Sequence, residues 1–267
     1  MASPAVSPAP PPPIFIGGVP RSGTTLLRVM LDSHANIHCG PELRAVPAIA
    51  RLWAGCRLSL DGPRAEAYRL DEETIRRPFA DAAMRMLAPN LAASGKPRAA
   101  EKTPGNLLVF AELAELFPGS PLVHVLRDGR DVVASRLEQE SRKLAVPRGP
   151  DAARTHAAEW ADAVERRRTL AGLPAYVEVR YEALTDAPEA VMRDLLERLG
   201  EPWDPAVLAH HRVPRETDGV AEWSADQVVR PVNRDARGRW RRDLSPGELA
   251  AVLEVAGPAL DDAGYAQ

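Results

Sequence analysis

Residues 14–27 read IFIGGVPRSGTTLL, and this stretch decides the fold. Apolar residues with strand character lead into a glycine-containing turn, and an apolar helical pattern follows two threonines. Gly18 and Gly23 have the spacing of a phosphate-binding loop, G-x-x-x-x-G, and Thr25 occupies its serine or threonine position. Such a turn binds phosphate because backbone N–H groups converge at a helix N-terminus, where the helix dipole adds partial positive charge. The stretch therefore predicts a phosphate site.

Thr24 stands where a loop of this type normally has lysine. That lysine contacts the β- and γ-phosphates of a nucleoside triphosphate, so its absence disfavours an ordinary ATPase or GTPase. Two alternatives stay open: a lysine from elsewhere in the chain substitutes for it, or the loop binds a nucleotide with a shorter phosphate chain. A glycine-rich turn with no ligand is the alternative, and the phosphate interpretation therefore requires a second site.

Residues 122–135, LVHVLRDGRDVVAS, form a second predicted strand, turn and helix. The apolar run over 122–126 is typical of a buried parallel strand. Arg127 follows at the strand tip, and Ser135 lies inside the expected helix. Arginine suits phosphate because its planar group makes two parallel hydrogen bonds. A local ion pair between Arg127 and Asp128 is the alternative.

Short apolar strands alternate with helices along the chain. Strands are expected at residues 14–16, 99–102, 122–126 and 176–179, and helices at 24–31, 71–90, 151–171 and 187–199. This alternation predicts an α/β fold, in which a parallel sheet containing the phosphate loop is flanked by helices. We expect a single domain over residues 14–267. Residues 1–13 are rich in Ala, Ser and Pro and predict a disordered, partly polyproline-II arm.

The composition is that of an ordinary soluble protein. The 267 residues are 45% hydrophobic and 27% charged, and the net charge of −3 gives no general case for nucleic-acid binding. The two cysteines, Cys39 and Cys56, form neither a disulfide scaffold nor a zinc motif, although one cross-link between them is an alternative. No apolar run approaches the roughly 18 residues of a membrane span. We therefore expect a reduced, cytoplasmic protein.

Several polar residues stand at strand ends or helix starts, where ligands collect in parallel sheets. Glu42 opens a predicted helix, either as a residue that favours the helix dipole or as a carboxylate that accepts a substrate proton. Lys102 ends a predicted strand, with a solvated surface lysine as the alternative. His34 and His38 are expected to be structural or solvated, and His34 and His124 are the next candidates for a base after Glu42.

Residues 223–242 have no clear period, and they contain two tryptophans and six arginines. A long irregular segment in a compact domain is usually functional or disordered, and the tryptophans argue against disorder. We expect an ordered basic loop that closes over an anionic ligand. An exposed basic patch and nucleic-acid binding are the alternatives.

These motifs together resemble a known family. Residues 17–25 resemble the 5′-phosphosulfate loop of sulfotransferases that use 3′-phosphoadenosine-5′-phosphosulfate (PAPS), and residues 127–135 resemble their 3′-phosphate motif. The resemblance is strongest to protein-tyrosine sulfotransferases and extends through residues 30–34, Cys39, Gly40, Glu42, Arg44 and residues 226–233. It covers nearly the whole chain and implies a sulfotransferase-like fold.

The resemblance also implies roles for individual residues. The 5′-phosphosulfate would be held by Arg21, Ser22, Gly23, Thr24 and Thr25, and the 3′-phosphate by Arg127 and Ser135. The cofactor site would be completed by Tyr181, Ser224, Gln227, Val228, Arg230, Asn233 and Arg239. Glu42 would be the general base for in-line attack by an acceptor hydroxyl, without a metal. Arg44, Lys102 and Ser224 would stabilise the transferring group and its leaving phosphate.

The sequence departs from the family pattern at several positions. Pro41 stands where the family has an acidic residue, and Thr103 stands where it has an aspartate. Gln139 and Ala48 each replace an arginine, and Arg239 replaces a lysine. Ala100 replaces the cysteine that would pair with Cys39. The loss of an arginine at Ala48 weakens the case for a strongly acidic peptide acceptor. We expect a cytoplasmic relative, without the family's secretory anchor, that modifies a peptide tyrosine or a small-molecule hydroxyl. A P-loop nucleotide kinase, a non-catalytic PAPS-binding relative and a homodimer are left open.

Overall fold

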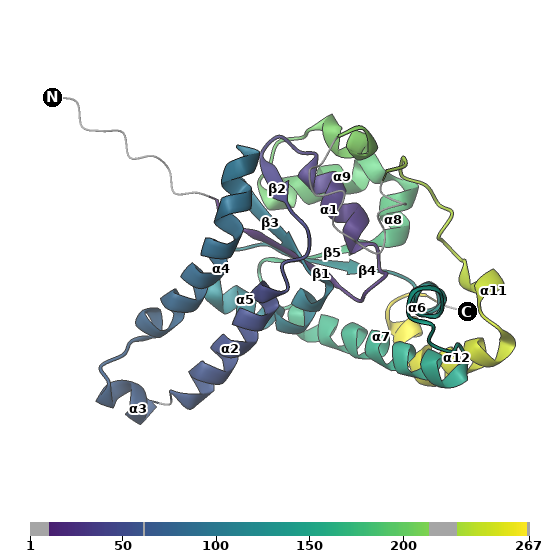
Figure 1. Cartoon of the computed structure of the whole chain (residues 1–267), viewed down its shortest axis with the longest axis horizontal. Coiled ribbons are helices and arrows are strands. Elements are labelled where there is room, and N and C mark those ends of the chain that lie inside the picture. Colours follow the sequence, from purple (N-terminus) through teal and green to yellow (C-terminus); the bar gives the residue numbers. More distant parts are fainter. Residues whose placement is uncertain (1–10, 61, 214–228, 266–267) are drawn as a thin grey trace.

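The protein is described by a computed structural model that covers residues 11–60, 62–213 and 229–265 (Figure 1). Its strands form one parallel sheet in the order β2-β3-β1-β4-β5. The strands are β1 (Ile14–Gly18), β2 (Ile37–Cys39), β3 (Arg98–Lys102), β4 (Leu122–Leu126) and β5 (Tyr176–Arg180). The predicted α/β fold, with helices flanking a parallel sheet, is confirmed.

Strand β1 lies at the centre of the sheet, and its residue Ile16 is paired with Lys102 on one side and Val123 on the other. Every residue of β1, β3 and β4 is buried, which explains the nearly continuous apolar runs of β1 and β4. After β1 the chain moves to one edge of the sheet, and after β3 it crosses to the other side of β1. Parallel α/β sheets bind ligands at such a reversal of strand order.

Helices cover both faces of the sheet (Figure 1). On one face, helix α1 (Thr24–Asp32), helix α9 (Pro188–Leu199) and the 3-10 segment η2 (Pro205–Arg212) pack over Ile14, Ile16 and Val123. The opposite face, with Phe15 and Leu122, is covered by α2 (Ala45–Ser59), α5 (Phe110–Leu116), α6 (Gly129–Leu144), α7 (Pro150–Leu170) and α12 (Pro246–Asp262). The connecting elements are α3 (Gly62–Ala67), α4 (Glu72–Ser94), η1 (Pro104–Val109), α8 (Tyr181–Asp186) and α11 (Trp240–Asp243).

Several elements differ from the expectation. Helix α2 begins at Ala45, so Glu42 lies in the loop before this helix and does not open it, and its interpretation as a first-turn residue that favours the helix dipole is wrong. Strand β2 was not predicted, because three residues are too few to show a periodic pattern; pairing with β3 places Cys39 opposite Ala100. Helix α4 begins at Glu72 and runs past residue 90 to Ser94, with Asp71 as its cap. The Asp71 side chain accepts a hydrogen bond from the N–H of Thr74 at 2.7 Å.

The N-terminal arm lies mostly outside the described residues, so its predicted disorder stays a prediction. Where the description begins, the carbonyl of Pro12 accepts a hydrogen bond from the guanidinium of Arg98 at 2.9 Å. None of the helices in the described ranges has the length and apolar character needed to cross a membrane. Cys39 and Cys56 are both unbonded thiols.

Candidate functional site

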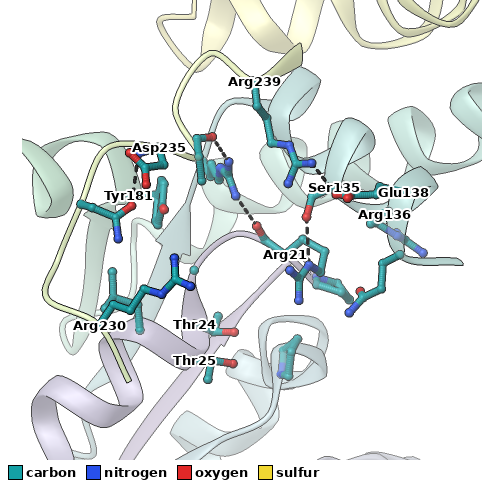
Figure 2. A pocket seen from close by; sticks show the side chains of 18 of the residues that line it. Arg21, Thr24, Thr25, Ser135, Arg136, Glu138, Tyr181, Arg230, Asp235 and Arg239 are labelled. Atoms are coloured by element: carbon teal, nitrogen blue, oxygen red, sulfur yellow. Dashed lines mark hydrogen bonds and ion pairs between the residues drawn. The ribbon is translucent and has the colours of Figure 1, made fainter. Parts of the chain in front are cut away.

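A cavity of about 840 Å³ opens at the carboxyl edge of the sheet, beneath the segment that leads into α11 (Figure 2). Each of the five strands contributes a lining residue within three positions of its end: Arg21 after β1, Pro41 after β2, Pro104 after β3, Arg127 after β4 and Tyr181 after β5. This is the edge at which parallel α/β sheets bind ligands, and the volume suits a nucleotide-sized molecule.

The loop between β1 and α1 has the geometry of an anion site. Gly23 is in the left-handed region, with φ 102°, and a Cβ placed on it would lie 2.3 Å from the ring of Tyr181. Only glycine satisfies both conditions. No side chain caps α1, and the Oγ of Ser22 is buried without a hydrogen-bond partner among the described residues. The helix N-terminus therefore keeps donors available for an anion.

Arg21 joins the two predicted phosphate motifs. Its Nε donates a hydrogen bond to the Oγ of Ser135 at 3.0 Å, and its carbonyl accepts one from Arg127 at 3.0 Å (Figure 2). Arg21 also has φ 78°, an unfavourable value for a residue with a side chain. Strain of this kind is typical of functional sites. Two motifs about a hundred residues apart therefore meet in one cavity.

The cavity carries a strong excess of positive charge. Among its described lining residues, nine arginines or lysines stand against four carboxylates. Burial, followed by the neighbouring charges of Arg127 and Arg239, lowers the pKa of Arg21 to about 10. Crowded cations of this kind repel one another, and a bound polyanion would relieve that repulsion. The electrostatics therefore favour a ligand with more than one negative charge.

Arg127 is almost fully buried and is held on several sides. Its guanidinium lies 4.4 Å from the centre of the Tyr181 ring, donates to the carbonyl of Ala236 and lies 3.7 Å from Asp131. Its Nε has no hydrogen-bond partner among the described residues. The alternative of an ion pair with Asp128 is wrong, because the Asp128 carboxylate is paired with Arg130 at 2.8 Å.

Asp131 was missed by the sequence analysis, because an acid in the first turn of a helix usually only favours the helix dipole. Here its carboxylate accepts hydrogen bonds from the backbone N–H groups of Gly238 and Trp240, at 2.8 and 3.0 Å. Arg130 stacks on the Trp240 ring at 4.4 Å. Together these contacts fix the basic C-terminal segment over the cavity, as far as it lies within the described residues.

A second group of residues adjoins the phosphate loop. The Nζ of Lys102 lies 2.9 Å from the Oε1 of Glu42 and 3.4 Å from the Oγ1 of Thr25. Lys102 is completely buried, so its interpretation as a surface lysine is wrong. Glu42 remains partly exposed and lines the cavity, and exposed Arg44 lies 3.7 Å from its other carboxylate oxygen. A carboxylate and an ammonium thus lie beside the N-terminus of α1.

The predicted residues of the C-terminal segment divide into two groups. Arg230, Asn233 and Arg239 line the cavity, and Arg239 is paired with Glu138 and Asp243 (Figure 2). Ser224, Gln227 and Val228 lie outside the described residues. Gln139 also lines the cavity, whereas Ala48 is exposed on α2 and is not part of its lining.

The two alternative bases lie elsewhere. His34 is buried, with Nε2 2.8 Å from the carbonyl of Pro202 and Nδ1 3.0 Å from the N–H of Asn36. His124 is buried in β4, with Nδ1 2.7 Å from the hydroxyl of Tyr176. Neither histidine lines the cavity, so both have structural positions, which for His34 agrees with the expectation.

His124 makes stability depend on pH. Burial, followed by the charge of Arg167, lowers the pKa of His124 to about 3. The unfolded chain, with an ordinary histidine pKa of about 6.5, binds more protons between these values. The free energy of unfolding therefore decreases as pH falls below about 6.5, because His124 binds its proton only in the unfolded chain. The decrease is about 1.4 kcal/mol per pH unit until the pKa of the folded state is reached. Urea unfolding at pH 7 and pH 5 should show a larger loss for the wild type than for His124→Gln. Equal losses would contradict this assignment.

The chain is similar to known proteins along most of its length. A family model described as "Sulfotransferase family" matches residues 12–205. Protein-tyrosine sulfotransferase 1 of Danio rerio is 37% identical over 268 residues, covering 95% of this chain and 72% of that protein. Protein-tyrosine sulfotransferase of Drosophila melanogaster is 35% identical over 266 residues. The match covers 95% of this chain, but the chain spans only 52% of the length of that relative.

Solved structures agree on the fold. The sulfotransferase domain of an olefin synthase from Synechococcus PCC 7002 has a TM-score of 0.65 at 22% identity, covering 93% of this chain and 94% of that one. A mouse sulfotransferase complexed with PAP (adenosine 3′,5′-bisphosphate) has a TM-score of 0.58 at 13% identity, covering 95% of this chain and 87% of that one. The predicted sulfotransferase-like fold is confirmed. No cluster of three or more potential metal ligands occurs in the part of the chain that the structure describes.

Proposed function

The chain belongs to the sulfotransferase family, and we propose that it transfers a sulfuryl group from PAPS to the phenolic hydroxyl of a peptide tyrosine. The observation that carries the proposal is the hydrogen bond from Arg21 to Ser135, which joins two anion-binding motifs in one cavity. The carboxylate of Glu42 lies in the same cavity, next to Lys102. The tyrosine acceptor is proposed from the relatives, which are protein-tyrosine sulfotransferases.

The residues of the cavity fit PAPS. PAPS carries a 3′-phosphate and a 5′-phosphosulfate, and the cavity has two groups of anion-binding residues. The N-terminus of α1 and the Oγ of Ser22 would hold the 5′ end, and Ser135 with the Nε of Arg127 would hold the 3′-phosphate. Both of these side-chain atoms lack a hydrogen-bond partner within the described part of the chain. Tyr181, Arg230, Asn233 and Arg239 would complete the site. When bound, PAPS supplies an activated sulfuryl group on a phosphate leaving group.

We assign the acid–base chemistry to Glu42. Its carboxylate would accept the proton of the acceptor hydroxyl while the oxygen forms its bond to sulfur and the bond between sulfur and the 5′-phosphate oxygen breaks. Lys102 and the N-terminus of α1 lie on the side of the phosphate loop and would stabilise negative charge on the departing oxygen. A sulfuryl group carries less negative charge than a phosphoryl group, so fixed cations and backbone donors suffice for this role.

The kinase alternative also has a structural observation behind it, because Lys102 lies near Thr25 and is thus a lysine beside the phosphate loop. Thermal unfolding discriminates the two, since a ligand at one hundred times its Kd adds about 2.7 kcal/mol of stability. We expect PAP to raise the Tm in the presence of EDTA, and ATP with Mg²⁺ to raise it less. The reverse ranking would favour the kinase.

Transfer itself is tested with ³⁵S-labelled PAPS and a pair of peptides that differ only in tyrosine or phenylalanine at one position. We expect label on the tyrosine peptide alone, with mass spectrometry locating the sulfate on its phenolic oxygen. Binding of PAP without transfer to this peptide or to a panel of small phenols and alcohols would instead indicate a non-catalytic relative.

A further inference from the structure

Glu101 is a buried carboxylate to which none of the motifs assigns a role. It precedes Lys102 in β3 and is only 2% exposed. Its Oε1 accepts hydrogen bonds from the N–H of Leu43 at 3.1 Å and from the hydroxyl of Thr103 at 2.6 Å. Its Oε2 accepts one from the side-chain amide of Asn106 at 2.5 Å. A fully buried charge with three donors is costly to place, and it is therefore unusual without a specific role.

The position of Glu101 links it to Glu42 through the backbone. Successive side chains of a strand point to opposite faces, so Glu101 and Lys102 leave β3 on opposite sides. Lys102 contacts the carboxylate of Glu42, and Glu101 binds the N–H of Leu43, the next residue along the chain. Adjacent residues of β3 therefore hold the loop after β2 at two neighbouring points.

Asn106 extends this network to the centre of the sheet. The same Nδ2 that donates to Glu101 also donates to the carbonyl of Ile16 in β1, at 3.1 Å. Glu101 thus ties the loop after β2 to β3, to η1 and to the strand that leads into the phosphate loop. Burial raises the pKa of Glu101, and the hydrogen bonds from Asn106, Thr103 and Leu43 oppose that shift.

We propose that Glu101 is a positioning residue that holds the backbone of residues 41–44 and so keeps the Glu42 carboxylate 2.9 Å from the Lys102 ammonium. The catalytic part of this inference rests on the proposed role of Glu42. This position requires a carboxylate, because both oxygens of the side chain must accept hydrogen bonds. Oε1 accepts from the N–H of Leu43, and Oε2 accepts from the amide of Asn106. A glutamine at position 101 would face one of these donors with its own NH₂ group.

The test is a double-mutant cycle of Glu101→Gln and Glu42→Gln. We expect Glu101→Gln alone to lower kcat about 100-fold, the effect of a misplaced catalytic group, with PAP affinity within about twofold of wild type. In the Glu42→Gln background the same change should lower kcat by less than about threefold, because the group that it positions is already lost. Equal effects in both backgrounds would overturn the inference.

Glu248→Gln is the matched control. Glu248 is also a buried carboxylate, paired with Arg148 and capping α12 through Ser245, and it lies outside the cavity lining. We expect this variant to lose stability but to keep the wild-type kcat. A loss of kcat equal to that of Glu101→Gln would show a general effect of destabilisation and would overturn the inference.

Amide hydrogen exchange tests the positioning without any need for activity. We expect the Leu43 amide to exchange about fivefold faster or more in Glu101→Gln, and unchanged in Glu248→Gln. Unchanged exchange in Glu101→Gln would overturn the inference, even in a protein that transfers no sulfate. Should Glu101→Gln not fold, Glu101→Asp keeps the charge but is one methylene shorter, and the same acceleration is expected.

Discussion

Glu42→Gln should lower turnover at saturating PAPS and tyrosine peptide by about 10²- to 10⁴-fold, the range for loss of a general base. The amide cannot accept the acceptor proton, but it preserves the shape of the side chain. Its Oε1 can still accept a hydrogen bond from Lys102. Affinity for PAP should therefore stay within about twofold of wild type. Single-turnover transfer of ³⁵S and calorimetric titration of PAP measure the two quantities.

Glu115→Gln provides the control for this variant. Glu115 is a partly exposed carboxylate that accepts a hydrogen bond from Trp53 at 2.9 Å and lies outside the cavity lining. Its substitution should leave turnover unchanged. Turnover of Glu42→Gln at the wild-type level would move the base to another residue and contradict the proposed chemistry.

Arg127→Lys should weaken PAP binding about 10- to 100-fold, the loss expected for hydrogen bonds to a charged group. Lysine keeps the positive charge but lacks the planar fork that lies over Tyr181 and contacts the carbonyls of Arg21 and Ala236. Adenosine 5′-monophosphate has no 3′-phosphate, so its affinity should change less than about twofold. Calorimetric titration of both nucleotides against both proteins gives the comparison.

The matched control is Arg167→Lys, because Arg167 pairs with Asp262 at a distance from the cavity lining. This variant should bind both nucleotides as the wild type does. An equal loss of affinity for both nucleotides in Arg127→Lys would mean that Arg127 supports the fold rather than the 3′-phosphate. Intact PAP affinity would reject its phosphate role altogether.

The sequence predicted well the features that are encoded locally. The spacing of Gly18 and Gly23 identified the phosphate loop. The structure explains why Gly23 must be glycine, because its backbone is left-handed and a Cβ would clash with the ring of Tyr181. The apolar run of β4 predicted its burial, since central parallel strands are apolar on both faces. Short β2 was missed because its formation depends on pairing with β3 rather than on its own pattern.

The features that were missed depend on contacts between distant segments. The roles of Asp131 and Glu101 follow from backbone N–H groups at Gly238, Trp240 and Leu43, which no local pattern connects with them. For Glu101 one signal was present: it lies inside a predicted strand of a parallel sheet, where a charged residue that is buried requires partners. No comparable signal marks Asp131, because acids are common in the first turn of a helix.

The central claim is that one adenine nucleotide spans the two anion-binding motifs joined by Arg21 and Ser135. A crystal structure of the complex with PAP tests it most directly. The account predicts the 3′-phosphate within about 3 Å of Arg127 or Ser135, and the 5′-phosphate at the N–H groups of the first turn of α1. A ribose phosphate bound away from both Arg127 and Ser135 would contradict it.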